Sequence, residues 1–139
     1  MPSARLTRAV HFAAGHRYHR PEWSPQRNEE VFGPCAGAPG HGHNYRCEVT
    51  VEGQVDPATG MVADLGRLDR LLQERIVEPM DHAFLNEVED FRGDLEIPTT
   101  ENICRVVWNR LEPVLPDRVR LVRVRVHEDR DLWSEYAGG

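Results

Sequence analysis

Four stretches of the chain are predicted as β-strands, and the first three alternate between apolar and polar residues, which is typical of strands that bury one face. They cover residues 7–16, 44–54, 119–128 and 132–136, and the last is short enough for an edge strand. A fifth stretch, 61–63, resumes the strand pattern directly after a turn. It predicts a hairpin partner for the second strand.

Alternate residues of each predicted strand form its inward face. His16 ends the inward face of the first strand, and His43 begins that of the second. Glu128 continues the apolar face of the third strand, where a carboxylate is costly to desolvate unless it has a partner. The apolar residues expected on these faces are Val10, Phe12, Ala14, Tyr45, Cys47, Val49, Val51, Val122, Val124 and Val126.

Two other stretches repeat apolar residues at the spacing of amphipathic helices. Asp64 can cap a helix that runs to about Glu78 and is ended by Pro79. A second helix starts within 98–102, where hydroxyl caps precede an acidic residue, and runs to about residue 115. The inward stripes are Leu65, Leu68, Leu72 and Ile76, followed by Ile103, Val107, Leu111 and Val114.

The order of these elements predicts one α+β domain over residues 1–139, an antiparallel four-stranded sheet with two helices on one face. At 139 residues and 40% hydrophobic content, the chain can bury one small core. A segment rich in proline and glycine, 17–40, joins the first two strands. We expect a long loop here, and a loop of this length in a small domain is usually either functional or disordered.

Charge and cysteine content exclude several classes of function. The net charge of −6 argues against nucleic acid or an anionic membrane surface as the main partner. All 17 basic residues are arginine, so chemistry through a lysine Schiff base is excluded. The odd number of cysteines, with no signal peptide or long apolar run, predicts a reducing, cytoplasmic location. Of these, Cys47 lies within a strand pattern and is expected to pack in the core.

Three histidines are candidates for a metal centre. His41 and His43 are two residues apart, so both imidazoles point to one face if this segment is a strand. With His16 they form a set of three neutral imidazoles, which suits zinc and leaves one coordination position open. Cys35 could close that position as a fourth ligand, or act as a thiolate base. Histidines bonded to backbone groups are the plain structural alternative.

Two acidic residues lie in motifs with more than one interpretation. Asp81 precedes His82 just after Pro79, which suits proton transfer if a turn brings the side chains together. Without that turn the two are an ordinary surface pair. Glu101 falls in the first turn of the second helix, where it can simply stabilise the helix dipole.

Seven short motifs occur in order along nearly the whole chain, and together they are highly specific. They are FAAGH (12–16), FGPC (32–35), GHGHNY (40–45), VDPATGMV (55–62), MDH (80–82), TTEN (99–102) and VHE (126–128). In these motifs the sequence resembles the family of 6-pyruvoyl-tetrahydropterin and 6-carboxy-tetrahydropterin synthases. It departs from that family at Asp129, where threonine is usual, and at the small residues before His16, where serines are usual.

The resemblance implies three groups of site residues. The implied zinc ligands are His16, His41 and His43. The implied proton-transfer residues are Cys35, Asp81 and His82. The positions implied to hold the pterin ring are Thr100, Glu101 and Glu128. In this family the subunits pair through their sheets into a β-barrel, typically a homohexamer, with active sites at subunit boundaries.

The implied reaction converts 7,8-dihydroneopterin triphosphate to 6-pyruvoyl-tetrahydropterin with loss of triphosphate, a step of tetrahydrobiopterin biosynthesis. Zn²⁺ would act as the Lewis acid, and arginines would hold the triphosphate. The second candidate product is 6-carboxy-tetrahydropterin, made for deazapurines such as queuosine. The long loop and the six-residue step from Cys35 to His41 favour the first product. A non-catalytic zinc domain or a pterin-binding domain is the alternative of another class.

Overall fold

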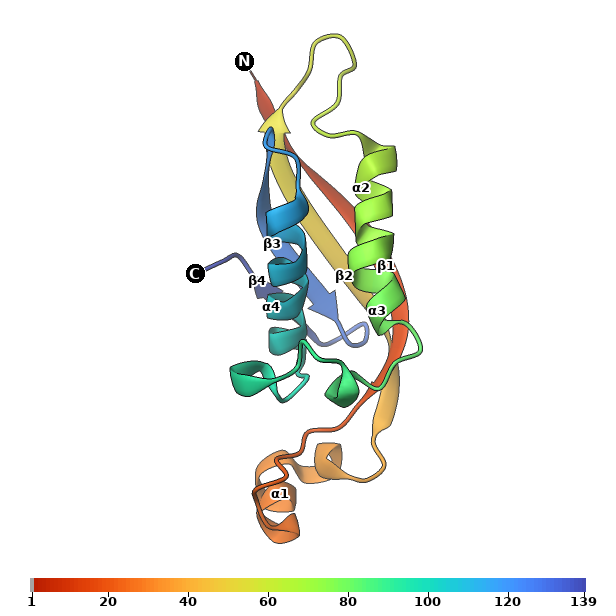
Figure 1. The fold of residues 1–139 in the computed structure, drawn as a ribbon, viewed down its shortest axis with the longest axis vertical. Helices are drawn as coiled ribbons and strands as arrows, with labels where there is room; N and C mark the ends of the chain where they lie inside the picture. The colour runs from red at the N-terminus through yellow and green to blue at the C-terminus, as the bar shows by residue number, and fades with distance from the viewer. Residues whose placement is uncertain (1) are drawn as a thin grey trace.

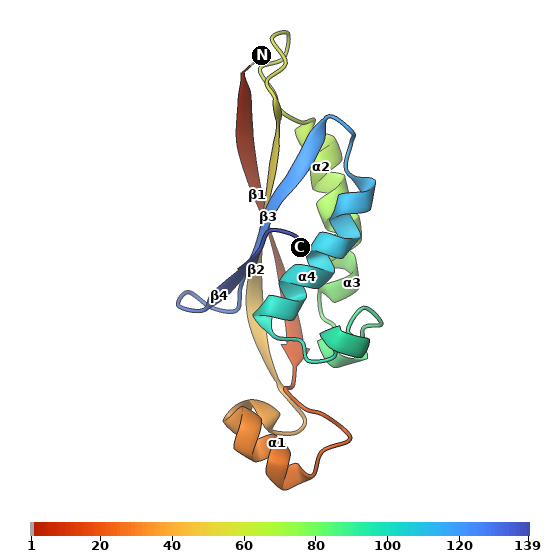
Figure 2. The ribbon, with the colours of Figure 1, turned by 90° about the vertical axis from the view of Figure 1, so that its left-hand side faces the viewer.

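The computed structural model describes residues 2–139. Its centre is an antiparallel sheet of four strands in the order β1-β2-β3-β4, with the long helices on one face (Figures 1 and 2). The strands are β1 (Ser3–His16), β2 (His41–Gln54), β3 (Val119–His127) and β4 (Trp133–Tyr136). The predicted α+β class is confirmed, with the helices on one face of a four-stranded antiparallel sheet (Figure 2).

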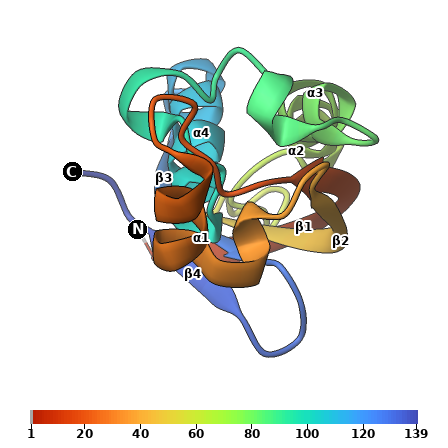
Figure 3. The ribbon, with the colours of Figure 1, turned by 90° about the horizontal axis from the view of Figure 1, so that it is seen from below.

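Two helical stretches cover the sheet and lie side by side (Figures 1 and 3). The first comprises α2 (Leu65–Leu72), a π-helical segment (Gln73–Val77) and α3 (Glu78–Met80), and the second is α4 (Thr100–Leu111). Three-residue 3₁₀ turns lie at Leu85–Glu87, Gly93–Leu95 and Glu112–Val114. No helix among residues 2–139 is both long and apolar enough to cross a membrane.

The predicted caps form, but the first helix does not stop before Pro79. The Asp64 side chain accepts a hydrogen bond from the Arg67 N–H, as expected of a cap. The helix then continues to Met80, past Pro79. The wide π turn before it explains this, because the N–H of Glu78 bonds to the carbonyl of Gln73 and the ladder is already shifted where the proline lacks a donor.

Most inward residues are buried as predicted. Val10 and Val114 are only partly buried, and two further exceptions, Leu65 and Val122, have local causes. Leu65 is 41% exposed because it stands at the first position of α2. Val122 is only partly buried because a β-bulge between Thr50 and Val51 shifts the register of β3. The bulge turns Leu121 inward instead, at 4% exposure.

Residues 61–63 do not form the predicted strand. Both edges of β2 are already paired, one with β1 and the other with β3, so no ladder is open to them. The preceding turn does form, with the Gly60 N–H bonded to the carbonyl of Asp56. Val62 and Ala63 are buried at the rim of the core.

The prediction of a loop over residues 17–40 is wrong in part. The segment contains α1 (Pro25–Phe32) and a 3₁₀ turn (Gly33–Ala36). This lobe projects beyond the end of the sheet (Figures 1 and 2). Ser24 caps α1 by accepting from the Arg27 N–H, and Pro25 occupies the first helical position. The serine–proline pair was therefore a helix-start signal that the abundance of prolines obscured.

Candidate active site

The pairing of β1 with β2 brings the three candidate metal ligands together. His16 is the cross-strand partner of His41, and Ala14 is the partner of His43. Because His41 and His43 are two residues apart in a strand, their side chains share the face of His16. One ligand atom from each of the three imidazoles lies within 4.8 Å of the others. The predicted metal trio is thus assembled by strand register alone.

The surroundings of His16 keep its imidazole neutral. Its Nδ1 lies 2.8 Å from the carbonyl oxygen of Pro98 and 3.1 Å from the hydroxyl of Tyr45. The pKa of His16 is lowered to about 4, chiefly by burial; the hydrogen bond to the Pro98 carbonyl opposes this shift, and the neighbouring His41 and His43 add to it. A carbonyl can only accept, so Nδ1 carries the proton and Nε2 presents its lone pair.

The atoms that face the centre of the trio fit a bound cation. Nε2 of His16 and Nε2 of His43 are buried without a hydrogen-bond partner. The Glu128 carboxylate, 12% exposed, places one oxygen 3.5 Å from each of these two nitrogens. A lone pair on Nε2 of His16 and a carboxylate oxygen do not satisfy one another, whereas a divalent cation held by the three imidazoles would bind that lone pair and balance the nearby carboxylate charge. Three imidazoles form a donor set suited to zinc.

Cys35 lies in the 3₁₀ turn of the lobe and is not a member of the histidine group. Its carbonyl accepts a hydrogen bond of 2.9 Å from the Tyr18 N–H, which ties the turn to the chain leaving β1. The Tyr18 ring packs edge-on against His16, with 5.2 Å between ring centroids. Burial raises the pKa of Tyr18, and Glu128, Cys35 and Glu101 raise it further. Tyr18 therefore links the turn that carries Cys35 to the histidine group.

The sequence interpretation missed Tyr18, although its position offered a signal. It lies two residues after His16, so it continues the same face beyond the end of β1. Its neighbours in the lobe, Phe32 by ring contact and Cys35 by backbone, come from the segment expected to be a loop. Only the folded lobe reveals that contact.

Asp81 and His82 form the pair that the sequence suggested, at a turn after α3. His82 has a positive φ of 61°, and its Nδ1 lies 2.9 Å from a carboxylate oxygen of Asp81. The other carboxylate oxygen accepts the Ala13 N–H, and this bond, followed by the one from His82, lowers the pKa of Asp81. The turn makes possible a contact that a helix would forbid.

Within one chain, the Asp81–His82 pair shares a surface hollow with one histidine of the trio but is not bonded to it. His82 has an 83% exposed side chain and borders this hollow together with Gly42, His43 and Asn44. Among the described residues, no hydrogen bond or ion pair links Asp81 or His82 to Cys35 or to the trio.

The start of α4 joins the site from a third direction. Thr100 is 2% exposed, and its hydroxyl donates to a carboxylate oxygen of Glu101 at 3.0 Å. Glu101 itself is exposed, so its carboxylate is open to a ligand. The structure also brings the hydroxyl of Ser134, on β4, to this pair, which the sequence did not predict.

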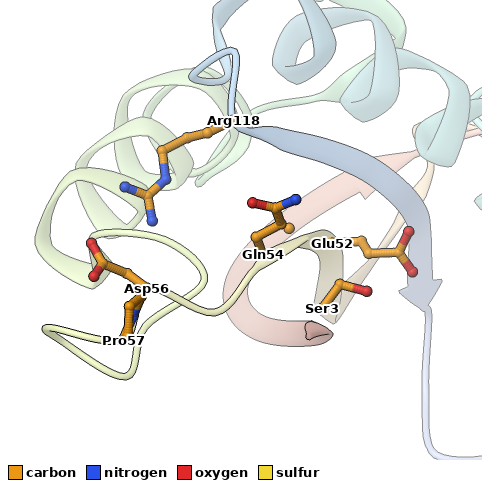
Figure 4. A pocket seen from close by; sticks show the side chains of 7 residues that line it. Ser3, Glu52, Gln54, Asp56, Pro57 and Arg118 are labelled. Atoms are coloured by element: carbon orange, nitrogen blue, oxygen red, sulfur yellow. The ribbon is translucent and has the colours of Figure 1, made fainter. Parts of the chain in front are cut away.

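A larger hollow, about 650 Å³, opens at the other end of the sheet (Figure 4). Ser3 and Gln54, which are paired at the start of the β1–β2 ladder, border it together with Asp56 and Arg118. The trio lies at the opposite end of the same ladder. This hollow contains none of the candidate site residues, so the chemistry is concentrated at the lobe end.

Comparison with known proteins agrees with this arrangement. The sequence profile of the family described as 6-pyruvoyl tetrahydropterin synthase matches residues 5–139. The chain belongs to the 6-pyruvoyl tetrahydropterin synthase family. It is 41% identical over 135 residues to the human 6-pyruvoyl tetrahydrobiopterin synthase, covering 97% of this chain and 92% of the human protein.

A solved structure and a relative from the second product branch are also similar to this chain. The solved structure of 6-pyruvoyl tetrahydropterin synthase from Caenorhabditis elegans superposes with a TM-score of 0.91 at 33% identity, covering 100% of this chain and 98% of that one. A putative 6-carboxy-5,6,7,8-tetrahydropterin synthase of Archaeoglobus fulgidus is 40% identical over 95 residues, 68% of this chain and 73% of its own length. Both product branches named by the sequence resemblance are therefore represented among its relatives.

Proposed function

We propose that the protein is a metal-dependent lyase that converts 7,8-dihydroneopterin triphosphate to 6-pyruvoyl-tetrahydropterin and triphosphate. The observation that carries this proposal is the convergence of His16, His41 and His43 beside Glu128. Relatives bearing the 6-pyruvoyl name match over nearly the whole chain, which supports the same activity.

His16, His41 and His43 would hold the cation, which we propose to be Zn²⁺. When bound, it would supply Lewis-acid polarisation of the substrate's side-chain oxygens and so acidify the neighbouring C–H bonds. The protein's own part is to keep His16 neutral and oriented, through its Nδ1–H bond to the carbonyl of Pro98. A fourth protein ligand is not part of this proposal, since Cys35 lies outside the histidine group.

Proton transfer is assigned to Cys35, Asp81 and His82. Cys35 as thiolate would take a carbon-bound proton of the substrate side chain, and His82, oriented by Asp81, would move a second proton. The reduction of the ring balances the oxidation of the side chain, so no external redox cofactor is required. Because His82 does not meet Cys35 within one chain, we propose that a second copy completes the site in a barrel-forming hexamer.

The ring end of the substrate would lie at the start of α4. A pterin presents two adjacent N–H donors along one edge, which a carboxylate can accept in pairs. Glu101 is open and already oriented by Thr100, and Glu128 closes the side nearest the metal ligands. Both carboxylates are therefore assigned to substrate recognition, with Thr100 beside them.

Incubation of the purified protein with 7,8-dihydroneopterin triphosphate, followed by product identification by mass, tests the proposal. The mass of 6-pyruvoyl-tetrahydropterin with release of triphosphate is expected. The mass of 6-carboxy-tetrahydropterin would instead assign the second branch, the activity named for the Archaeoglobus relative. Pterin binding without triphosphate release would refute the catalytic assignment.

A further inference from the structure

Three side-chain oxygens from α4 and β4 form a closed triangle beside the site. The Thr100 hydroxyl oxygen lies 2.5 Å from that of Ser134 and 3.0 Å from Oε1 of Glu101. The Ser134 hydroxyl oxygen completes the triangle at 3.3 Å from the same Oε1. Two of the contacts share one oxygen of the Glu101 carboxylate, and the third joins the two hydroxyl groups.

Counting protons assigns a direction to these bonds. Two hydroxyls supply two protons for three contacts, and the short distance between the hydroxyl oxygens requires a proton between them. The remaining proton goes to the carboxylate, and Thr100 is the nearer donor. The arrangement that satisfies the geometry is Ser134 donating to Thr100, and Thr100 donating to Glu101.

This chain of bonds leaves half of the carboxylate available. No hydrogen bond or ion pair among the described residues uses Oε2 of Glu101, while Oε1 accepts from Thr100 and lies 3.3 Å from the Ser134 oxygen. The anchor itself is firm, because Thr100 is buried and the thiol of Cys104 donates to the carbonyl of Ser134 at 3.3 Å. Glu101 is thus held at one oxygen and open at the other.

We propose that Ser134 is a positioning residue for substrate recognition, acting through Thr100 to fix the Glu101 carboxylate for the paired N–H donors of a pterin ring. This inference rests on the proposed function, since it takes the ligand of Glu101 to be a pterin. An exposed glutamate samples several rotamers, and holding one of them reduces the entropy lost on binding. Ser134 contributes affinity without touching the ligand.

The test is a double-mutant cycle on the metal-loaded oligomer, with 7,8-dihydroneopterin as a probe that lacks the leaving group. S134A should weaken binding by about 10-fold, the scale of a lost hydrogen bond in a charged network. E101A should weaken it further, and S134A added to E101A should have no additional effect, because the two act in series. Ser3→Ala, at the far end of the sheet, is the matched control and should bind as the wild type does.

Kinetics with the triphosphate substrate provide a second readout. S134A should raise KM by a factor similar to its change in affinity and leave kcat within about 2-fold, because the reacting atoms lie elsewhere. S134T, which keeps a hydroxyl, should approach wild-type affinity, and S134V, of similar shape, should resemble S134A. This matched pair carries the test if S134A does not fold.

The possible outcomes distinguish a failure of the inference about Ser134 from a failure of the proposed function. Wild-type binding by S134A and S134V would overturn the role of Ser134 while the proposed function stands. The same conclusion would follow if the loss of affinity in the S134A/E101A variant equalled the product of the two single losses. A wild-type protein that neither binds the probe nor releases triphosphate would overturn the proposed function and this inference with it.

Discussion

His16 and His41 are partners in the last pair of the β1–β2 ladder, and their ring centroids lie 4.6 Å apart. The metal trio therefore depends on strand register more than on any loop. A slip of one residue between β1 and β2 would turn the imidazoles of His41 and His43 to the opposite face. The long ladder that joins Ser3 to Gln54 at its other end fixes that register.

We expect one divalent cation to bind per chain at the trio. His43→Gln should lower the affinity for zinc by more than about 100-fold, because even partners outside the ligand set cost about 10- to 100-fold. Competition with a chromophoric chelator measures this. His11→Gln, an exposed histidine on β1, is the control and should leave the affinity unchanged. Equal affinities in both variants would contradict the assignment.

Replacing Cys35 by alanine should abolish turnover of the triphosphate substrate and leave the metal bound, because the sulfur lies outside the histidine group. Activity assays and metal analysis of the same sample measure the two effects. The cobalt-substituted wild type should lack a thiolate charge-transfer band. Wild-type-like activity in the variant would refute the role of base, and a band that disappears with Cys35 would favour a structural site.

The Asp81 carboxylate makes one bond to the backbone and one to His82, and two substitutions separate their proposed effects. Asp81→Ala removes the acceptor of the Ala13 N–H and should lower the urea midpoint, whereas Asp81→Asn keeps an oxygen there and should not. Both remove the negative charge beside His82 and should lower kcat/KM by about 100-fold, the lower range for acid–base catalysis. Full activity in the asparagine variant would exclude a catalytic role for the carboxylate.

The metal-free protein should lose stability as the pH falls from 6.5 to about 4, the interval between the ordinary and the lowered pKa of His16. In that interval the unfolded chain binds a proton at this residue and the folded chain does not, so the loss deepens with acidification. The full effect is on the order of 3 kcal/mol. Urea titrations across this range measure it, with His16→Gln expected to flatten the slope and His11→Gln to preserve it.

Local sequence patterns were enough to predict most of the sheet and the position of the histidine trio. Alternation alone placed His16 and His43 inward, because a strand has only two faces. The bulge that displaced Val122 could not be foreseen, since it depends on how β3 pairs with β2. The false strand at 61–63 has the same cause, because the pattern does not reveal that both edges of β2 are taken.

Contacts between distant segments were the least predictable part of the site. Ser134 and Tyr18 have no local motif, and their roles follow from packing against Thr100 and His16 respectively. Glu101 was recognisable from the helix start, but the oxygen that remains open was not. Hydrogen-bond geometry of this kind depends on the meeting of α4 with β4.

The lobe that carries Cys35 leaves the sheet at His16 and returns at His41, two residues that face each other. Its ends are therefore clamped together whatever its interior contains, and the entropic penalty of lengthening it rises only logarithmically. The segment can therefore change in length or sequence, and the position of the Cys35 thiol with it, while the imidazole cluster stays in place.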